Sequence, residues 1–267
     1  MNPSTPSLAA RITSGDPLYG LIVKMPSPAV VEQAGYAGFD LVVIDTEHGM
    51  ADNAELEHHL RAADSVGIPV IVRIGANDPL LTLRALDAGA TGVIVPHVSN
   101  AEDAQAAVRG AHYPPTGTRG LAVSTRAGHH GAKTVHQHIS DASATTVVVG
   151  QVEDNEAAQH SSEIAETPGL NAVWIGPSDL SLSLGLPGQP EHPAVVAAID
   201  QIATAVVASP DCALCVLVDS PQEAADWHAR GAKIMLFNSS AIHTRELRAI
   251  TTAVRSIGTP VRVEGHH

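Results

Sequence analysis

One segment decides the fold class of this chain: Phe39-Asp40-Leu41-Val42-Val43-Ile44-Asp45-Thr46-Glu47-His48-Gly49. In it, an apolar run of strand length leads directly into two carboxylates and an imidazole. A continuous Val/Ile/Leu run is typical of a strand buried on both faces, as in a parallel sheet covered by helices. The charged cluster then lies at the carboxyl end of the strand, where α/β proteins bind ligands and carry out chemistry.

Strand-length apolar runs recur along the whole chain and alternate with Ala-rich segments that have apolar residues at three- and four-residue steps. The predicted strands are 20–24, 40–45, 69–74, 92–96, 145–152, 172–176, 213–219 and 233–238. Predicted helices include 53–66, 79–88, 101–111, 156–166, 193–209, 221–230 and 241–257. About eight such units with right-handed crossovers predict a single (β/α)₈ barrel formed by residues 1–267. An open doubly wound sheet is the weaker alternative, because no Gly-x-Gly-x-x-Gly follows the first strand.

Composition and charge limit the class of protein. The chain has 267 residues, a net charge of −13 and only two cysteines, so no disulfide framework is expected and a reducing cytoplasm is the natural compartment. No apolar segment approaches the length of a membrane span, and the first six residues lack a secretory signal. The acidic balance disfavours nucleic acid or an anionic membrane as partner, whereas a small anionic substrate remains compatible.

One segment interrupts the strand–helix alternation. Residues 112–141 are rich in Gly, Pro and His and contain no clear strand or helix pattern. Long loops inside compact domains are usually functional. We therefore expect a substrate-side loop over the mouth of the barrel.

Polar residues collect at the carboxyl ends of the predicted strands. They are Asp45, Glu47 and His48 after the second strand, Arg73 at the end of the third, Gln151 and Glu153 at the fifth, and Asp179 after the sixth. Each alone has a structural explanation, such as an ion pair for Arg73 or a helix first turn for Asp179. In a barrel, however, these ends lie on one rim, and a carboxylate pair from neighbouring strands, Glu153 and Asp179, suits Mg²⁺ or Mn²⁺.

Other candidates are weaker. Lys24 ends the first predicted strand, but a Schiff-base lysine needs a desolvated pocket that the sequence does not reveal, so we expect it to line the mouth at most. Cys212 and Cys215 have the spacing of a redox motif within an apolar strand pattern, which favours buried core thiols. The remaining histidines, including His97 after the fourth strand, are expected to be solvated or structural.

Taken together, the motifs resemble those of the HpcH/HpaI family of metal-dependent (class II) pyruvate aldolases. The similar stretches are Asp45-Thr46-Glu47-His48-Gly49, Val72-Arg73, Tyr113-Pro114-Pro115-Thr116-Gly117-Thr118-Arg119-Gly120, Gln151-Val152-Glu153, Ile175-Gly176-Pro177-Ser178-Asp179-Leu180-Ser181 and Gly188-Gln189-Pro190-Glu191-His192-Pro193. The match runs in order from about Gly20 to Phe237, nearly the whole chain.

The resemblance implies a (β/α)₈ barrel assembled as a hexamer, a trimer of dimers, with a C-terminal helix exchanged between subunits. It implies a divalent metal (Mg²⁺, Mn²⁺ or Co²⁺) held by Glu153 and Asp179, with Arg73 stabilising the enolate and His48 acting as base. In addition, Asp45 and Asp87 would orient His48, and the pocket for the 2-oxo acid would be completed by Gln151, Gly176, Pro177 and Ser178.

The activity expected from this resemblance is reversible cleavage of 4-hydroxy-2-oxo acids into pyruvate, or a close analogue such as hydroxypyruvate, and an aldehyde. A related lyase acting on a CoA thioester, of the citrate or malyl-CoA lyase type, is one alternative, although no cluster of Lys and Arg is evident for the nucleotide. A barrel that binds a 2-oxo acid without converting it is another.

Overall fold

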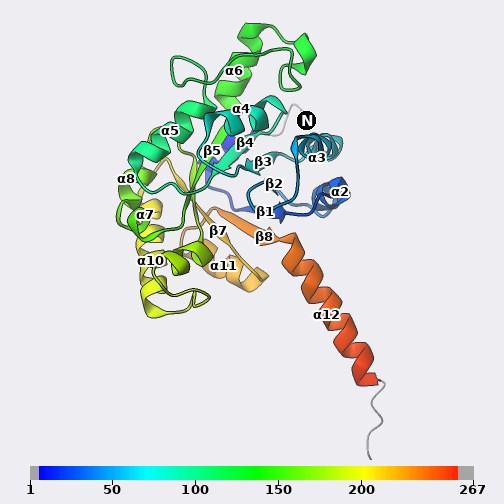
Figure 1. Cartoon of the computed structure of the whole chain (residues 1–267), viewed down its shortest axis with the longest axis vertical. Coiled ribbons are helices and arrows are strands. Elements are labelled where there is room, and N and C mark those ends of the chain that lie inside the picture. The colour runs from blue at the N-terminus through cyan, green and yellow to red at the C-terminus, as the bar shows by residue number, and fades with distance from the viewer. Residues whose placement is uncertain (1–5, 258–267) are drawn as a thin grey trace, which may run out of the picture.

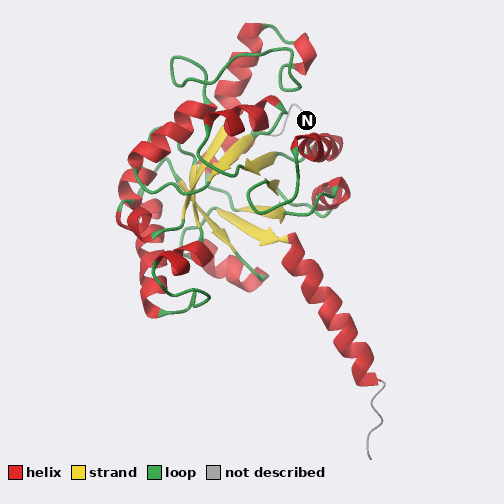
Figure 2. Cartoon of the chain, viewed as in Figure 1, coloured by secondary structure: helices red, strands yellow, loops and turns green. Residues whose placement is uncertain are grey.

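The structure is a computed structural model that describes residues 6–257. Its eight parallel strands close into one barrel in chain order, with β1 paired to β8 (Figures 1 and 2). The strands are β1 (Leu18–Val23), β2 (Leu41–Asp45), β3 (Val70–Arg73), β4 (Gly92–Val95), β5 (Val147–Val152), β6 (Ala172–Ile175), β7 (Ala213–Leu217) and β8 (Ile234–Asn238). The predicted (β/α)₈ barrel is confirmed, and every predicted strand corresponds to one of these. Residues 1–5, within the stretch judged to lack a secretory signal, lie outside the described part.

Helices surround the strands, as Figure 2 shows. They are α1 (Leu8–Ser14), α2 (Pro28–Tyr36), α3 (Asn53–Val66), α4 (Pro79–Asp87), α5 (Ala101–Ala111), α6 (Val135–Thr145), α7 (Asn155–Gln159), α8 (Ser161–Ala165), α9 (Pro177–Ser183), α10 (Pro193–Ala208), α11 (Pro221–Ala229) and α12 (Ser239–Ile257), with a short 3₁₀ turn, η1 (His129–Gly131). The helix predicted at 156–166 is divided at His160 into α7 and α8. Among the described helices, none combines the length and apolar character needed to cross a membrane.

Alternation along the strands produces two buried layers. In β2, Leu41 and Val43 belong to a cluster that fills the barrel, whereas Val42 and Ile44 belong to the cluster between sheet and helices. Successive side chains of a strand point to opposite faces, so all four are buried although only half of them face inward. The continuous apolar run thus reflects burial on both faces.

The barrel is closed at its amino end by α1. Leu8 and Ile12 of this helix are buried and belong to the same cluster as the inward-facing strand residues. Ser7 caps the helix, because its side chain accepts a hydrogen bond from Ala10 N. With the amino end filled by apolar side chains, a polar site is left to the carboxyl ends.

The expectation that residues 112–141 cover the barrel mouth is wrong. They follow α5, which returns the chain from the carboxyl end to the amino end of the strands. The loop accordingly packs on the last turns of α3 and α4. Arg126 donates to Leu60 O of α3 through Nη2 (3.3 Å) and to Ala88 O after α4 through Nη1 (2.8 Å), and Ala127 N donates to Asp87 O (3.1 Å). The segment is also not a single loop, since α6 begins at Val135 and contacts α1. Figure 1 shows α6 and the preceding loop outside the ring of helices.

The last helix, α12, leaves the barrel after β8 and extends away from it (Figure 1). It carries an apolar stripe at steps of three and four residues that stays exposed in the described chain: Leu247, Ile250, Val254 and Ile257. A stripe with this spacing is the face by which a helix packs on another element. Within residues 6–257 nothing covers it.

Candidate active site

Strand alternation brings the polar residues of the sequence analysis to one rim. Asp45 follows the inward-facing Leu41 and Val43 by the same two-residue step, and Arg73 follows the inward-facing Ile71 in the same way. Asp45 and Arg73 are also register partners across β2 and β3. Both therefore point inward at the carboxyl end of the barrel, directly beside each other.

Arg73 and Asp45 form a buried ion pair with two contacts. Arg73 Nε donates to Asp45 Oδ1 (3.1 Å) and Arg73 Nη2 donates to Asp45 Oδ2, while their exposed fractions are only 4% and 0%. Burial alone would raise the pKa of Asp45, but the hydrogen bonds and charge of Arg73 outweigh it, with help from the backbone N–H of His48 and the charge of Lys24, so the pKa lies below its usual range. The pair fixes the guanidinium in place.

The other edge of the guanidinium faces the site. Arg73 Nη1 donates to Gln151 Oε1 (3.3 Å), and Gln151 Nε2 donates to Glu153 Oε2. Trp174 lies against the same group, with its ring centroid 5.0 Å from Arg73 Cζ. A continuous chain of polar contacts thus links β2, β3 and β5.

The turn after β2 is held by Asp45. Its Oδ1 accepts hydrogen bonds from the backbone N–H groups of Glu47 and His48, each at 3.1 Å. Gly49 is required there, because a Cβ at this position would lie 1.9 Å from Asp45 O. Asp45 thus orients the backbone of His48 rather than its imidazole. The imidazole is half-exposed, with Nε2 3.8 Å from Glu47 Oε2.

Three donor groups converge beside this turn: Glu47, His97 and Glu153. One ligand atom of each lies within 4.8 Å of the others. His97 Nδ1 is 3.1 Å from Glu153 Oε1, and His97 Nε2 is 3.7 Å from Glu47 Oε1. The sequence indicates no functional role for His97, and the structure adds it to the cluster. Glu47 is also 3.1 Å from Arg73 Nη1 through Oε2.

The charge balance of this cluster suits a cation. Burial raises the pKa of Glu153; the backbone N–H and the charge of His97 act against this rise, and the nearby carboxylates of Glu47 and Asp179 add to it. Asp179, in the first turn of α9, is thus close enough to Glu153 for their charges to interact. Glu47 Oε2 is buried and accepts no hydrogen bond from the described residues, although it forms an ion pair with Arg73 Nη1 at 3.1 Å. Carboxylate oxygens with one imidazole form a donor set that a divalent metal fits.

Two more features border the cluster. Gly176 precedes α9, and a Cβ there would lie 2.7 Å from Glu153 Cβ, so glycine lets this backbone approach the site closely. Pro177 and exposed Ser178 follow it in the first turn of α9. Lys24 follows β1 and lies 3.7 Å from Asp45 Oδ2 through Nζ. Lys24 thus lies at the carboxyl end of the barrel beside this buried carboxylate.

Not all sequence candidates lie at this rim. Asp87 ends α4 at the amino end of the barrel, where Arg119 Nη2 donates to its Oδ1 (2.8 Å). Within one chain it therefore does not orient His48. Cys212 and Cys215 are buried free thiols in and beside β7, as expected. Burial raises the pKa of Cys212 to about 12 and raises that of Cys215 as well.

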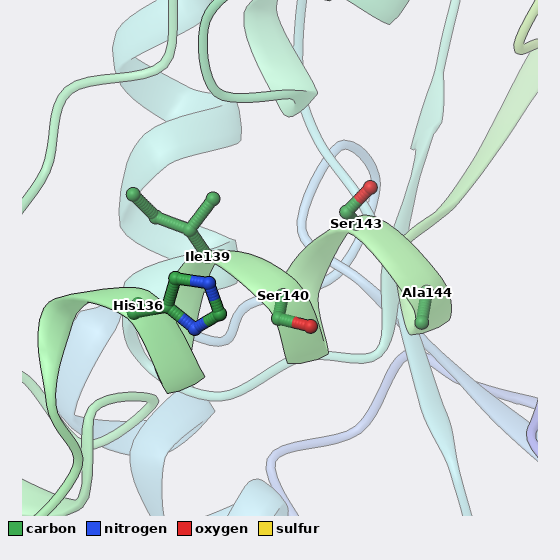
Figure 3. A pocket seen from close by; sticks show the side chains of 5 residues that line it. All are labelled: His136, Ile139, Ser140, Ser143 and Ala144. Carbon is green, nitrogen blue, oxygen red and sulfur yellow. The ribbon is translucent and has the colours of Figure 1, made fainter.

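A hollow on the surface lies elsewhere. It has a volume of about 500 Å³ and lies along one face of α6, lined by His136, Ile139, Ser140, Ser143 and Ala144 (Figure 3). None of these residues contacts the polar cluster at the carboxyl ends, and the lining offers no carboxylate or guanidinium. The hollow therefore lacks the charged groups that gather at the rim.

Comparison with known proteins finds relatives over most of the chain. The model of a family described as HpcH/HpaI aldolase/citrate lyase matches residues 18–244, which include every residue of the polar cluster. The chain is 43% identical to a 2-dehydro-3,6-dideoxy-6-sulfogluconate aldolase of Pseudomonas putida over 65% of this chain and 67% of that protein. It is 35% identical to a hydroxypyruvate/pyruvate aldolase of Paraburkholderia phytofirmans over 77% of this chain and 80% of that protein. A crystal structure of a family member from Burkholderia cenocepacia superposes with a TM-score of 0.87 at 32% identity, covering 94% of this chain and all of that one.

Proposed function

This chain belongs to the HpcH/HpaI aldolase/citrate lyase family, and on that premise we propose that it is a metal-dependent aldolase. Its reaction would be the reversible cleavage of a 4-hydroxy-2-oxo acid into pyruvate, or a close analogue such as hydroxypyruvate, and an aldehyde. Relatives named pyruvate aldolase and 4-hydroxy-2-oxo-heptane-1,7-dioate aldolase, at 38% and 35% identity, support this class of substrate.

One observation carries the proposal. A fixed guanidinium, Arg73, lies next to a carboxylate and imidazole cluster on the same rim, and Gln151 joins the two. Cleavage of a β-hydroxy carbon–carbon bond places negative charge on the keto oxygen of the substrate. Groups that are aimed in advance at such a developing charge contribute most to catalysis.

Glu153 and Asp179 would hold the metal. When bound, a Mg²⁺, Mn²⁺ or Co²⁺ ion acts as a Lewis acid that polarises the oxo acid. Arg73 contributes the second positive charge on the substrate side. Its orientation is set by Asp45, so the guanidinium does not have to reorganise as charge develops. Gln151, Gly176, Pro177 and Ser178 would complete the pocket around the carboxylate of the oxo acid.

His48 would move the protons. In the cleavage direction its imidazole takes the proton of the C4 hydroxyl group, the C3–C4 bond breaks, and the electron pair moves to the keto oxygen as an enolate. The aldehyde leaves, and a proton added at C3 completes pyruvate. An imidazole suits this task because its ordinary pKa is near neutrality, whereas the arginine side chain stays protonated.

We also propose a homo-oligomer. The exposed apolar stripe of α12 suits a second copy of the chain, which would make α12 the exchanged helix of a hexamer. Asp87 does not reach His48 within one chain, so a role for it at the site requires a neighbouring subunit.

The two buried free thiols favour a reducing compartment such as the cytoplasm.

The test is a pyruvate-release assay on 4-hydroxy-2-oxo acids with each of the three metals, before and after EDTA. We expect EDTA to abolish cleavage and added metal to restore it, while Glu153→Gln stays inactive at every metal concentration. Glu156→Gln, an exposed site three residues away, is the control and should keep wild-type activity. Cleavage that ignores EDTA would refute the metal. Cleavage of a CoA thioester, with none of the hydroxy-oxo acids, would favour the lyase alternative.

A further inference from the structure

The carboxyl end of β1 carries a lysine that the proposed reaction does not use. We propose that Lys24 binds an anionic group, such as a carboxylate or a sulfonate, at the far end of the aldehyde half of the substrate. The inference rests on the proposed function for the kind of substrate, and it names the class of aldehyde that the site selects.

Lys24 points into the mouth of the barrel. It follows the inward-facing Ile22 by two residues, and residues at this step share one face of a strand. Val23 pairs with Ile44 in the register of β1 and β2, which places Lys24 beside Asp45 at the carboxyl end. Accordingly, Lys24 Nζ lies 3.7 Å from Asp45 Oδ2. The side chain of Lys24 is one-third exposed, so a small molecule in the mouth can reach it.

The ammonium group of Lys24 is not what holds Asp45 in place. Two hydrogen bonds from Arg73 already compensate that carboxylate, whereas the 3.7 Å between Lys24 Nζ and Asp45 Oδ2 is longer than a hydrogen bond. Lys24 is therefore a second cation beside a carboxylate that already has a partner. Its flexible four-carbon stem lets the ammonium group turn toward an anionic ligand.

The backbone around Lys24 is supported from two sides. A Cβ at Gly49 would lie 3.0 Å from Lys24 O, so the turn that carries His48 packs directly on this backbone. On the other side, Ser27 N donates to Nε2 of His59 (3.0 Å), a fully buried residue of α3. Lys24 thus extends from a fixed segment next to the turn after β2, as a side chain that selects between substrates requires.

The place of Lys24 on the rim matches the aldehyde half of the substrate. Glu153 and Asp179, the proposed metal ligands, follow β5 and β6, whereas Lys24 follows β1. Asp45 joins Lys24 to the proposed base, since its Oδ2 faces Lys24 Nζ and its Oδ1 accepts the backbone N–H of His48. If His48 takes the proton of the C4 hydroxyl group, the carbons beyond C4 extend past it, away from the metal. An oxo acid with a second anion at its far end would therefore meet positive charge at both ends.

The experiment measures the binding of three unreactive analogues to the full-length protein by calorimetry, with Mg²⁺ present. All three are 2-oxo acids without the C4 hydroxyl group. At the far end, 2-oxoheptanoate is neutral, 2-oxoheptanedioate carries a carboxylate and 6-sulfo-2-oxohexanoate carries a sulfonate. Lys24→Met removes the charge and keeps the length of the side chain, while Lys24→Arg keeps the charge. The matched control is Lys133→Met, because Lys133 also pairs with a carboxylate, that of Asp141 (2.7 Å), but at the amino end of the barrel.

We expect Lys24→Met to bind both anionic analogues about 10- to 100-fold more weakly, the range for losing one contact to a charged group. Its affinity for 2-oxoheptanoate should change by less than about threefold, which also verifies that the variant folds. Lys24→Arg should keep most of the binding, and Lys133→Met should match the wild type. A loss confined to one anionic analogue would identify the anion that Lys24 binds. Equal weakening of all three analogues, or of none, would overturn the proposal.

Addition of pyruvate to butanal and to 4-oxobutanoate separates this inference from the proposed function. Lys24→Met should raise KM for 4-oxobutanoate and leave kcat for both aldehydes near the wild-type value, because a contact made equally in the ground state and the transition state affects binding alone. A merely structural role of Lys24 would instead lower kcat for both aldehydes. Selective binding of the anionic analogues by a wild type that joins pyruvate to neither aldehyde would refute the proposed function alone. Addition to both aldehydes with the same ratio of KM values in the wild type and Lys24→Met would refute the role of Lys24 alone.

Discussion

Replacing Arg73 with methionine removes the guanidinium that compensates Asp45, and the structure indicates what this should cost. Asp45 is fully buried and receives two hydrogen bonds from Arg73. The nearest other cation, Lys24, is 3.7 Å from Asp45 and its side chain is one-third exposed, so it offsets only part of the charge. Leaving one partner of a buried ion pair without the other typically costs about 3 to 5 kcal/mol. We expect Arg73→Met to lower the free energy of unfolding of the metal-free protein by about that amount.

A second substitution separates stability from catalysis. Asp45→Asn removes the buried charge, while Asn Oδ1 can still accept the backbone N–H groups of Glu47 and His48. The double variant Arg73→Met/Asp45→Asn should therefore be more stable than Arg73→Met, with a coupling energy of about 2 kcal/mol for residues in direct contact. Its activity should stay low, because the charge on the keto oxygen is no longer stabilised, a loss of about 10²- to 10³-fold in kcat.

Urea unfolding of the metal-free proteins measures the free energy of unfolding, and pyruvate release from a 4-hydroxy-2-oxo acid measures kcat. A double variant no more stable than Arg73→Met would show that Asp45 is not the charge that Arg73 compensates. An Arg73→Met enzyme with kcat within tenfold of the wild type would refute the role of the guanidinium, because losing one such stabilising group costs at least about 10².

Three further outcomes are expected. The pKa of Asp45 is held below its ordinary 3.8, so its stabilising contribution is present above that pH and is lost as pH falls through the lower folded value. On acidification, the free energy of unfolding should therefore fall more steeply for the wild type than for Asp45→Asn. Parallel curves of unfolding free energy against pH would contradict this. Burial raises the pKa of Cys212 to about 12 and raises the pKa of Cys215 as well, so neither thiol should react with Ellman's reagent until the protein unfolds. Rapid labelling of the native protein would contradict the described packing. Leu247→Glu with Ile250→Glu places charges on the apolar stripe of α12 and should lower the mass measured by light scattering, while an unchanged oligomer would exclude the stripe as an interface.

The strands could be predicted from the sequence because burial on both faces leaves a continuous apolar run. The convergence of Asp45, Arg73 and Gln151 followed from the same pattern, since each lies at an inward-facing position near the end of its strand. The position of residues 112–141 could not be predicted from the strand pattern. The chain runs along α5 from the carboxyl end of the barrel to its amino end before the loop begins, so a loop placed directly after the fourth strand is assigned to the carboxyl end when it lies at the amino end.

The missed residue has a different explanation. His97 follows Pro96, just past the end of β4, and nothing in its neighbourhood distinguishes it from the other histidines of the chain. Its place in the cluster depends on a left-handed backbone and on the carboxylates that follow β5 and β2, neither of which a local pattern encodes. The helix α1, which closes the amino end of the barrel, could not be predicted either, because a helix of seven residues shows little periodicity.

The most direct measurement is deuterium exchange at the methyl group of pyruvate, followed by ¹H NMR in D₂O with metal present and no aldehyde. If one bound oxo acid is shared by the metal, Arg73 and a base, the methyl signal of pyruvate should decay with the wild-type enzyme, and EDTA, Glu153→Gln or Arg73→Met should each stop that decay. Pyruvate that binds in the presence of metal, yet keeps all its methyl protons, would contradict the account and leave a barrel that only holds the oxo acid.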